Sequence, residues 1–296
     1  FAAVMALLLL TGLCPNAFAA ELEETEPEVL RIGSAEDFLA FAENCALDSW
    51  SQGAQVQLLA DISLEGTDFA PIPTFGGSFD GGGHTISGLS LTQSLSPAGL
   101  FGTLQPTAVV KNLTVQGTVT PGGDGLSVGG IVGENHGMVE DCAFTGTVAG
   151  EINTGGIAGM NYGTLRACRA EGSVTGDNRT GGIAGYNFGR IASCRSDASV
   201  NTESVDPTIN PKNLRLNFNL DFSQTANLDA ADAASDTGGI AGYSSGTITD
   251  CVNTGPVGYP HIGYNLGGIA GRSCGFVESC RNEGFITGRK DVGGVV

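Results

Sequence analysis

Hydrophobic residues recur along this chain at a fixed spacing. Five segments share the template Gly-Gly-[Ile/Val]-[Ala/Val]-Gly-x-[Asn/Ser]-x-Gly-x-[Ile/Leu/Val]-x-x-Cys, and they begin at Gly129, Gly155, Gly181, Gly238 and Gly267. In each copy an apolar residue follows the opening glycine by two, ten and nineteen positions. Three short apolar segments per repeat, separated by glycines, predict a coil of three strands with tight corners.

The spacing of the copies predicts a stacked architecture. Copies one to three are 26 residues apart, and a sixth copy starts at Gly293, so we expect the repeat to continue beyond Val296. Self-similarity at such a period is the signature of a solenoid in which each coil contacts its neighbours. We therefore expect an all-β protein, a parallel β-helix over residues 55–296.

Two polar features of the template suggest roles in the coil. The glycines four and eight positions after the opening glycine, such as Gly159 and Gly163, are expected at corners that need positive φ. Between them the first three copies carry Asn135, Asn161 and Asn187. Stacked asparagines can form hydrogen bonds along the axis of a parallel stack.

The cysteines occupy one repeat position, thirteen residues after the opening glycine. They are Cys142, Cys168, Cys194, Cys251 and Cys280. Parallel coils lie about 4.8 Å apart, whereas the Cβ atoms of a disulfide lie about 3.8 Å apart in a set geometry. We therefore interpret the five as a structural ladder of buried thiols, not as disulfides.

An insertion interrupts the array between the third and fourth copies. It covers residues 201–236 and contains Leu214–Phe222, where apolar and polar residues alternate strictly. This alternation predicts a strand with one apolar face, which includes Phe218 and Phe222. Insertions in solenoids often carry binding, so these two residues are candidate surface-binding residues; a hairpin folded flat over the wall is an equal alternative.

The N-terminal region divides into three parts. Residues 1–20 combine a short apolar run with Ala17-Phe18-Ala19, which predicts a cleaved signal peptide and export to a secreted or cell-surface location. Residues 21–33 are predicted as an acidic, solvated leader. Residues 34–54 are expected to contain a capping helix, with Ser34 as the N-cap and Glu36 and Asp37 in the first turn.

Composition and charge limit the classes of partner that we expect for this chain. Hydrophobic residues make up 41% of the chain, which is too much for a disordered protein, and the formal net charge is −18. An acidic chain repels polyphosphates and anionic lipids, which argues against nucleic-acid binding. We also find no second apolar stretch long enough to span a membrane.

The pattern of candidate ligands and acids favours a scaffold over an enzyme. Twelve positions after the opening glycine, Asp141 and Asp250 lie at least three coils apart, so about 14 Å. Paired glycosidase carboxylates lie about 5 to 9.5 Å apart. No Cys-x-x-Cys or His-x-x-x-His pair occurs, so we expect no metal and no cofactor.

Positions fourteen and sixteen of the template carry opposite charges. Arg169 precedes Glu171 by two residues, and the pairs Arg195–Asp197 and Arg281–Glu283 repeat this spacing. Residues two apart in a strand share a face, here the face opposite the cysteine. The pattern predicts a surface ion-pair ladder, and Arg169 and Arg195 are the candidate surface-binding residues within it.

These motifs resemble a known family. The tetrads Gly156-Ile157-Ala158-Gly159, Gly182-Ile183-Ala184-Gly185 and Gly99-Leu100-Phe101-Gly102 are similar to the GLUG motif, and Ala60–Leu64 and Phe79–Ile86 resemble the entry coils of that family. The resemblance covers roughly residues 55–296. It implies a right-handed parallel β-helix on large exported or surface-attached bacterial proteins, with adhesive or spacer roles.

Together these observations predict a function without catalysis. Some relatives in the family adjoin metallopeptidase domains, but this chain lacks His-Glu-x-x-His and has only three histidines, so no peptidase activity carries over. We expect an exported or cell-surface β-solenoid that acts as an adhesive, binding or spacer module toward a host or neighbouring-cell glycan or protein. The alternative is a polysaccharide lyase or glycosidase of the β-helix class.

Overall fold

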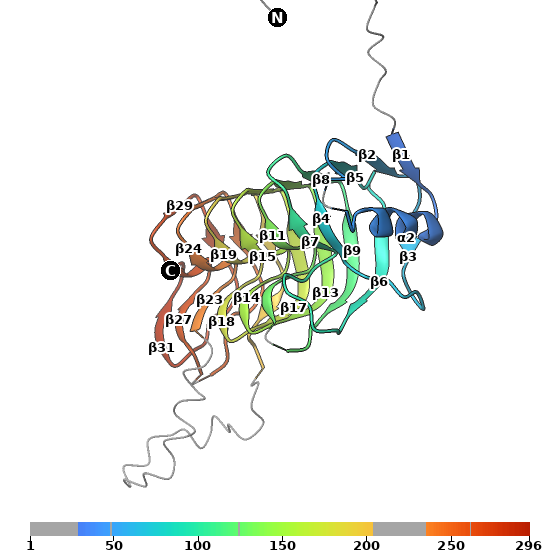
Figure 1. Cartoon of the computed structure of the whole chain (residues 1–296). Helices are drawn as coiled ribbons and strands as arrows, with labels where there is room; N and C mark the ends of the chain where they lie inside the picture. The colour runs from blue at the N-terminus through green and yellow to red at the C-terminus, as the bar shows by residue number, and fades with distance from the viewer. Residues whose placement is uncertain (1–28, 48, 124, 204–234, 261) are drawn as a thin grey trace, which may run out of the picture.

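The chain folds as a parallel β-helix of stacked coils with one helix at its N-terminal end (Figure 1). The computed structural model describes residues 29–296 except 48, 124, 204–234 and 261. Within these residues every strand pairing is parallel, and the strands form four sheets, called A to D here. The predicted all-β solenoid is confirmed.

Sheets A and B run the full length of the described solenoid. Sheet A contains β1 (Val29–Ile32), β2 (Gln55–Leu58), β5 (Ser78–Asp80), β8 (Val109–Lys111), β12 (Met138–Glu140), β16 (Thr164–Arg166), β20 (Arg190–Ala192), β25 (Thr247–Thr249) and β29 (Phe276–Glu278). Sheet B contains β3 (Ile62–Ser63), β6 (Thr85–Leu91), β9 (Thr114–Val119), β13 (Ala143–Ala149), β17 (Arg169–Thr175), β21 (Arg195–Ser196), β22 (Ser199–Val200), β26 (Val252–Asn253) and β30 (Arg281–Asn282).

Sheets C and D complete the wall. Sheet C contains β4 (Ile72–Phe75), β7 (Phe101–Leu104), β11 (Val132–Asn135), β15 (Ala158–Asn161), β19 (Ala184–Asn187), β24 (Ala241–Ser244) and β28 (Ala270–Ser273). Sheet D contains β10 (Leu126–Gly129), β14 (Ile152–Gly155), β18 (Asn178–Gly181), β23 (Ser235–Gly238), β27 (Tyr264–Gly267) and β31 (Lys290–Gly293).

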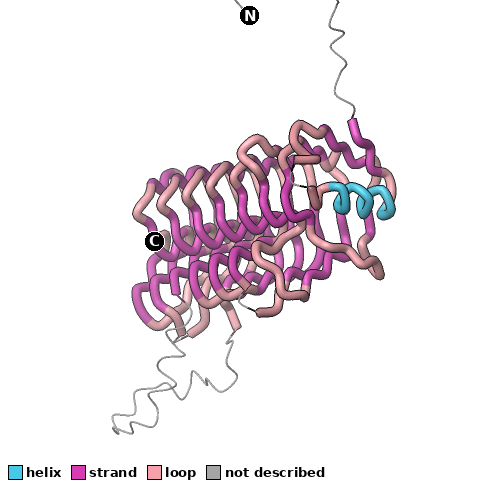
Figure 2. The backbone as a smooth tube through the Cα atoms, in the orientation of Figure 1, coloured by secondary structure: helices cyan, strands magenta, loops and turns pink. Residues whose placement is uncertain are grey.

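Each regular coil has four strands, not the three predicted from the apolar columns. One coil passes from β14 in sheet D through β15 and β16 to β17 in sheet B, and the next coil repeats this path (Figure 2). The strand in sheet D escapes the apolar pattern because its inward position is Val128, Thr154, Thr180, Thr237 or Leu266 in successive coils. Threonine hides the alternation that marks a strand.

The apolar columns fill the inside of the coils. The isoleucine two positions after the opening glycine is fully buried in every copy, at Ile131, Ile157, Ile183, Ile240 and Ile269. Val139, Leu165, Ile191 and Ile248 are also fully buried, and Val277 in the last coil packs against the same core. Burial of apolar surface contributes about 25 cal/mol per Å², so these columns stabilise the stack of coils.

The template glycines serve close packing between coils and not positive φ, so the prediction for Gly159 and Gly163 was wrong. Neither residue has a positive φ. A Cβ atom at Gly163 would overlap the carbonyl oxygen of Gly137 in the preceding coil, and one at Gly159 would overlap backbone of Ser127. The left-handed corners carry other residues, at position twelve (Asp141, Ala167, Ser193, Asp250, Ser279) and two before the glycine (Ser127, Asn153, Arg179, Asp236, Asn265, Asp291).

The predicted asparagine ladder is confirmed. Asn135 Nδ2 donates to Asn161 Oδ1 (2.8 Å), and Asn161 Nδ2 donates to Asn187 Oδ1 (2.8 Å). Asn187 Nδ2 then donates to the hydroxyl of Ser244 (3.0 Å). All four side chains are fully buried, so their hydrogen bonds satisfy polar groups that water cannot reach.

A helix covers the N-terminal end of the core. Helix α2 (Ala35–Asn44) has Ser34 as its N-cap, whose side chain accepts a hydrogen bond from the backbone N–H of Asp37 (3.2 Å). Its buried Phe38 and Phe41 contact Phe79 with ring centroids 6.5 and 5.7 Å apart. The helix therefore shields the first coils from water, as a solenoid end requires.

Two predicted boundaries differ from the structure. Residues 29–32, assigned to the solvated leader, form β1 and pair in register with β2, because Val29, Leu30 and Ile32 continue sheet A by one strand. Residues 235 and 236 belong to β23 and not to the insertion. The predicted signal peptide, most of the predicted leader, and the insertion residues Phe218 and Phe222 lie outside the described residues.

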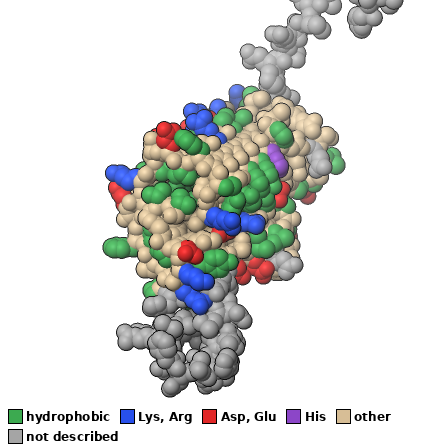
Figure 3. All heavy atoms as spheres, turned by 90° about the vertical axis from the view of Figure 1, so that its left-hand side faces the viewer, with side chains coloured by type: hydrophobic (Ala, Val, Ile, Leu, Met, Phe, Trp, Pro, Cys, Tyr) green, Lys and Arg blue, Asp and Glu red, His purple; other side chains and the backbone are tan. Residues whose placement is uncertain are grey.

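The opposite end exposes the last coil. Phe276, Phe285 and Val292 are 57%, 86% and 46% exposed, in contrast to the buried apolar residues of inner coils. Figure 3 looks onto this side of the molecule and shows hydrophobic side chains with charged ones between them. Val292 belongs to the inward column of sheet D, where Val128 and Leu266 are buried, whereas Phe276 pairs with Thr247 in a column that faces outward.

Candidate functional site

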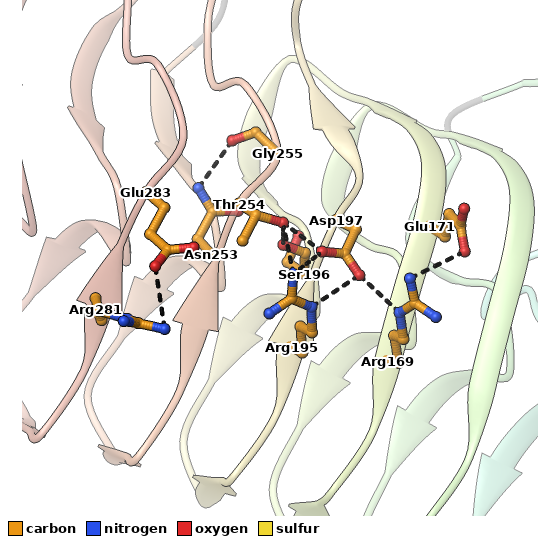
Figure 4. Close-up of polar contacts among 10 residues, drawn as sticks. All are labelled: Arg169, Glu171, Arg195, Ser196, Asp197, Asn253, Thr254, Gly255, Arg281 and Glu283. Atoms are coloured by element: carbon orange, nitrogen blue, oxygen red, sulfur yellow. Dashed lines mark hydrogen bonds and ion pairs between the residues drawn. The ribbon is translucent and has the colours of Figure 1, made fainter.

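The outer face of sheet B carries a charge ladder (Figure 4). Arg169 Nη2 lies 3.4 Å from Glu171 Oε2 in its own strand, and Arg169 Nε donates to Asp197 Oδ2 (2.6 Å) in the next coil. Arg195 Nη2 lies 2.8 Å from Asp197 Oδ1. A separate pair, Arg281 with Glu283 (3.0 Å), repeats the motif nearer the C-terminus. The three predicted pairs are present. The ion pair between Arg169 and Asp197, which joins two coils, was not predicted.

Asp197 is the centre of this ladder. Its side chain is 13% exposed and also accepts a hydrogen bond from the hydroxyl of Thr254. Partial burial raises the pKa of Asp197, but the hydrogen bonds from Arg195, Thr254 and Arg169 outweigh it and lower the pKa to about 2. Asp197 is therefore ionised at any pH at which the protein is expected to work.

The Asp197→Asn variant should lose about 1 kcal/mol of unfolding free energy at pH 7, because two guanidinium groups lose their shared anion. The folded pKa lies below the unfolded value of about 3.9, so the contribution is present above about pH 4. It is lost as pH falls through about 2. Urea denaturation of both proteins at pH 7 and at pH 2.5 measures this difference.

Glu283→Gln is the matched control, because Glu283 is 44% exposed and has one arginine partner. Its unfolding free energy should stay within about 0.5 kcal/mol of wild type. A difference between Asp197→Asn and wild type that is the same at pH 2.5 as at pH 7 would contradict the assigned charge state of Asp197.

The same geometry limits what Arg169 and Arg195 can bind. Both guanidinium groups are about half exposed, but both already donate to Asp197. A ligand would have to compete with a carboxylate that is held in place. The structure thus brings these two candidate residues together in one network, with few free donors.

A second charge ladder, not anticipated from the sequence, follows the outer face of sheet A. Lys111 Nζ lies 3.3 Å from Asp80 Oδ2, and Arg166 pairs with Glu140. The four residues occupy one register column of strands β5, β8, β12 and β16. Signs therefore alternate from coil to coil, which stabilises the stack by small increments.

The carboxylates of sheet B do not form an acid–base pair. Glu171 and Asp197 lie on either side of Arg169, so a guanidinium separates them. A glycosidase needs one carboxylic acid with a raised pKa, whereas the pKa of Asp197 is lowered. Asp141 and Asp250 occupy left-handed corners that follow strands of sheet A, and these corners are three coils apart.

A second pair of carboxylates in neighbouring coils, Glu151 and Asp177, lies at the edge of sheet D. The backbone N–H of Asp177 donates to the carbonyl of Glu151 (2.9 Å), which places the two residues next to each other where sheet D begins. Burial raises the pKa of Asp177. A carboxylic acid with a raised pKa in the neighbourhood of a second carboxylate is part of what a glycosidase requires.

The template cysteines face the interior. Cys142, Cys168, Cys194 and Cys251 are buried and Cys280 is half-buried, and all five are free thiols. The backbone N–H of Cys168 lies 3.4 Å from Cys194 Sγ, so the thiols follow one another from coil to coil. Burial raises the pKa of Cys142 to about 12, which keeps it a neutral thiol.

Exposed and half-buried aromatic rings form a strip on the outer wall, which the sequence analysis did not predict. His136, Tyr162 and Phe188 stack in successive coils, with ring centroids 4.6 and 4.7 Å apart and planes within 7°. Phe188 also stacks on Tyr186 (3.8 Å), which meets the edge of Tyr243 (4.8 Å). We call these five residues the aromatic strip. They occupy positions five and seven of the template, where the repeat shows no single residue type.

Basic side chains lie over the tyrosines of this wall. Arg179 lies 5.1 Å from the ring centroid of Tyr186, and Arg272 lies 5.6 Å from that of Tyr243. Lys290 lies 5.9 Å from the Tyr264 ring in sheet D. Such cation–π contacts each contribute about 0.5–1 kcal/mol at exposed sites. The strip thus combines apolar ring area with hydrogen-bond donors.

The residues that the structure describes contain neither a metal-binding cluster nor a membrane-spanning helix. Among them, no group of three or more His, Cys, Asp and Glu side chains is arranged to hold a metal ion. The helix found in residues 29–296, outside the gaps named above, is too short to cross a membrane.

Comparisons with known proteins give three matches. The family described as the GLUG motif matches residues 124–149. Halomucin of Haloquadratum walsbyi is 36% identical over 103 residues, which are 34% of this chain and 1% of halomucin. A crystal structure titled as that of "a putative immunoglobulin A1 protease from Bacteroides ovatus" matches with a TM-score of 0.53 and 21% identity, over 92% of this chain and 71% of that chain.

These matches agree with the coil register. The solved structure shares the fold alone at this identity, and the halomucin match spans a small part of that protein. The family match covers the first regular copy, whose strands β11, β12 and β13 align residue by residue with those of the next coil. Residues 124–149 therefore carry a GLUG motif, and this copy and its described neighbours fold as coils of a parallel β-helix.

Proposed function

We propose that this chain is a non-catalytic binding and spacer module of an extracellular or cell-surface protein. The similarity to halomucin and the GLUG motif support a surface location. The observation that carries the binding role is the aromatic strip, where Tyr162 and Phe188 are 42% and 40% exposed. Exposed aromatic side chains aligned on one wall are typical of interaction surfaces.

The spacer role follows from the coil geometry. Each coil adds about 4.8 Å along the axis, and the inner columns hold every coil in the same register as its neighbours. A stack of this kind extends a surface at a fixed orientation. Because the backbone register repeats from coil to coil, the outward side chains of its walls lie at regular intervals along the axis.

A glycan-array screen of the chain, with a reducing-sugar assay on the polysaccharides that bind, tests this proposal. We expect binding to at least one glycan or surface protein without release of reducing ends. Release of reducing ends or of unsaturated products would contradict the non-catalytic role. A chain that binds neither glycans nor surface proteins would contradict the binding role.

The alternative function, a carbohydrate-active enzyme, rests on Glu151 and Asp177. Their neighbouring positions and the raised pKa of Asp177 are the specific observations in its favour. If the reducing-sugar assay is positive, Asp177→Asn should abolish it, whereas Asp197→Asn should leave it unchanged. Activity that survives Asp177→Asn would exclude this pair as the catalytic carboxylates.

A further inference from the structure

We propose that the aromatic strip binds a neutral linear polysaccharide that runs along the solenoid axis. This inference rests on the binding role proposed above and names its surface and its ligand class. The shape of the strip is the first argument. Its five rings cross four coils in one continuous run, from His136 in the first regular coil to Tyr243 in the fourth.

A strip of this shape suits a chain-like ligand. It is one or two rings wide at each coil and lies between the polar corner of sheet D and the charge ladder of sheet A. A globular protein partner needs a broad patch, about 800 Å² on each side for a stable complex. A polymer with repeating units instead meets the same kind of contact at each coil along the axis.

The contacts offered by the strip are both apolar and hydrogen-bonding. Because Tyr162 stacks between His136 and Phe188, the ring faces are largely covered and the ring edges and the phenol hydroxyl point outward. Tyrosine and histidine present an apolar body with a polar tip. A pyranose chain has the matching pattern, with C–H groups on its ring and hydroxyl groups around its rim.

Charge selects a neutral polymer over an acidic one. The two arginines beside the aromatic strip, Arg179 and Arg272, lie over tyrosine rings and form no ion pair among the described residues. Two carboxylates belong to the same two sheets: Glu134 pairs in register with Met160 in sheet C, and Asp236 in sheet D accepts a hydrogen bond from Asn265 (2.7 Å). The formal charges of these four side chains cancel, while the net charge of −18 repels polyanions.

The strip could instead serve stability alone, since aromatic pairs contribute about 0.5–1.5 kcal/mol each. Binding and stability are measured separately. The probe is hydroxyethyl cellulose, and carboxymethyl cellulose is the acidic counterpart with the same backbone. We expect the chain to bind hydroxyethyl cellulose more tightly in affinity electrophoresis.

Substitution of two rings tests the surface. Tyr162→Ser with Phe188→Ser uses the residue that the fourth copy carries at the same position, Ser245. The double variant should bind hydroxyethyl cellulose about tenfold more weakly, which is what the loss of two aromatic contacts predicts. Phe285→Ser is the matched control, because it removes an 86% exposed ring outside the strip. Its affinity should equal that of wild type.

The outcomes separate this inference from the proposed function. Circular dichroism first establishes that each variant is folded at the assay temperature. Tighter binding of carboxymethyl cellulose than of hydroxyethyl cellulose, or unchanged affinity of the double variant, would overturn the inference. If the glycan array shows another ligand whose binding the double variant retains, the inference fails and the proposed function stands. If wild type binds no glycan or surface protein, both fail.

Discussion

Replacement of Gly163 by alanine is expected to lower the free energy of unfolding by about 3 kcal/mol or more. The new Cβ would overlap the carbonyl oxygen of Gly137 and crowd the carbonyl carbon of His136, which belong to the preceding coil. Both are backbone atoms of the bend between β11 and β12. The Gly137 carbonyl accepts from the Thr164 N–H (2.9 Å) and the His136 N–H donates to the Leu104 carbonyl (3.0 Å), so this backbone cannot move without straining hydrogen bonds between coils. The expected result is a lower midpoint of unfolding in urea, followed by far-ultraviolet circular dichroism.

Gly122→Ala provides the matched control. The nearest atom to its Cβ would be the carbonyl oxygen of Thr92 at 3.6 Å, an ordinary van der Waals contact, and its φ is not in the left-handed region. Its midpoint should therefore lie within about 0.5 kcal/mol of wild type. Equal midpoints for Gly163→Ala and Gly122→Ala would mean that the coils can separate locally, against the interpretation of the template glycines as close-packing residues.

The glycine columns illustrate how far the sequence predicts this fold. Spacing alone identified the coil, the inward columns and the asparagine ladder, because those features need particular residue types at each repeat. It could not tell a glycine that needs positive φ from one that needs close approach. The left-handed corners accept more residue types than expected, since Ala167 and Arg179 adopt positive φ there as well as Asp, Asn and Ser.

The candidate binding surface was harder to predict for a related reason. Position five of the template carries different residue types in different copies, such as Glu134 and Tyr186, and so does position seven, such as His136 and Phe188. Neither position therefore shows a repeated residue type that would indicate a binding surface. The strip appears only when the coils are stacked in register, because rings from different positions, such as Tyr186 and Phe188, complete it. Arg179, which lies over the Tyr186 ring, belongs to sheet D and not to the sheet that carries the strip. Outward residues of a repeat are not constrained by the packing of the coils, so a binding surface can form there from residues that differ between copies.

The asparagine ladder gives the second large effect. Asn161 is fully buried, accepts from Asn135 Nδ2 and donates to Asn187 Oδ1, both at 2.8 Å. In Asn161→Ala the Asn187 oxygen loses this donor and the Asn135 amide loses its best acceptor. An unsatisfied buried group costs about 1–3 kcal/mol, so we expect a loss of about 3 kcal/mol in urea denaturation.

Asn161→Ser separates hydrogen bonding from packing. Serine and alanine leave nearly the same cavity, but the serine hydroxyl can accept from Asn135, as Ser244 accepts from Asn187 Nδ2 (3.0 Å). The serine variant should therefore keep about 1 kcal/mol that the alanine variant loses. Equal losses would assign the cost to the cavity alone. Because the ladder joins four coils, amide exchange should also quicken in the neighbouring coils of Asn161→Ala, as nearest-neighbour coupling in a solenoid requires.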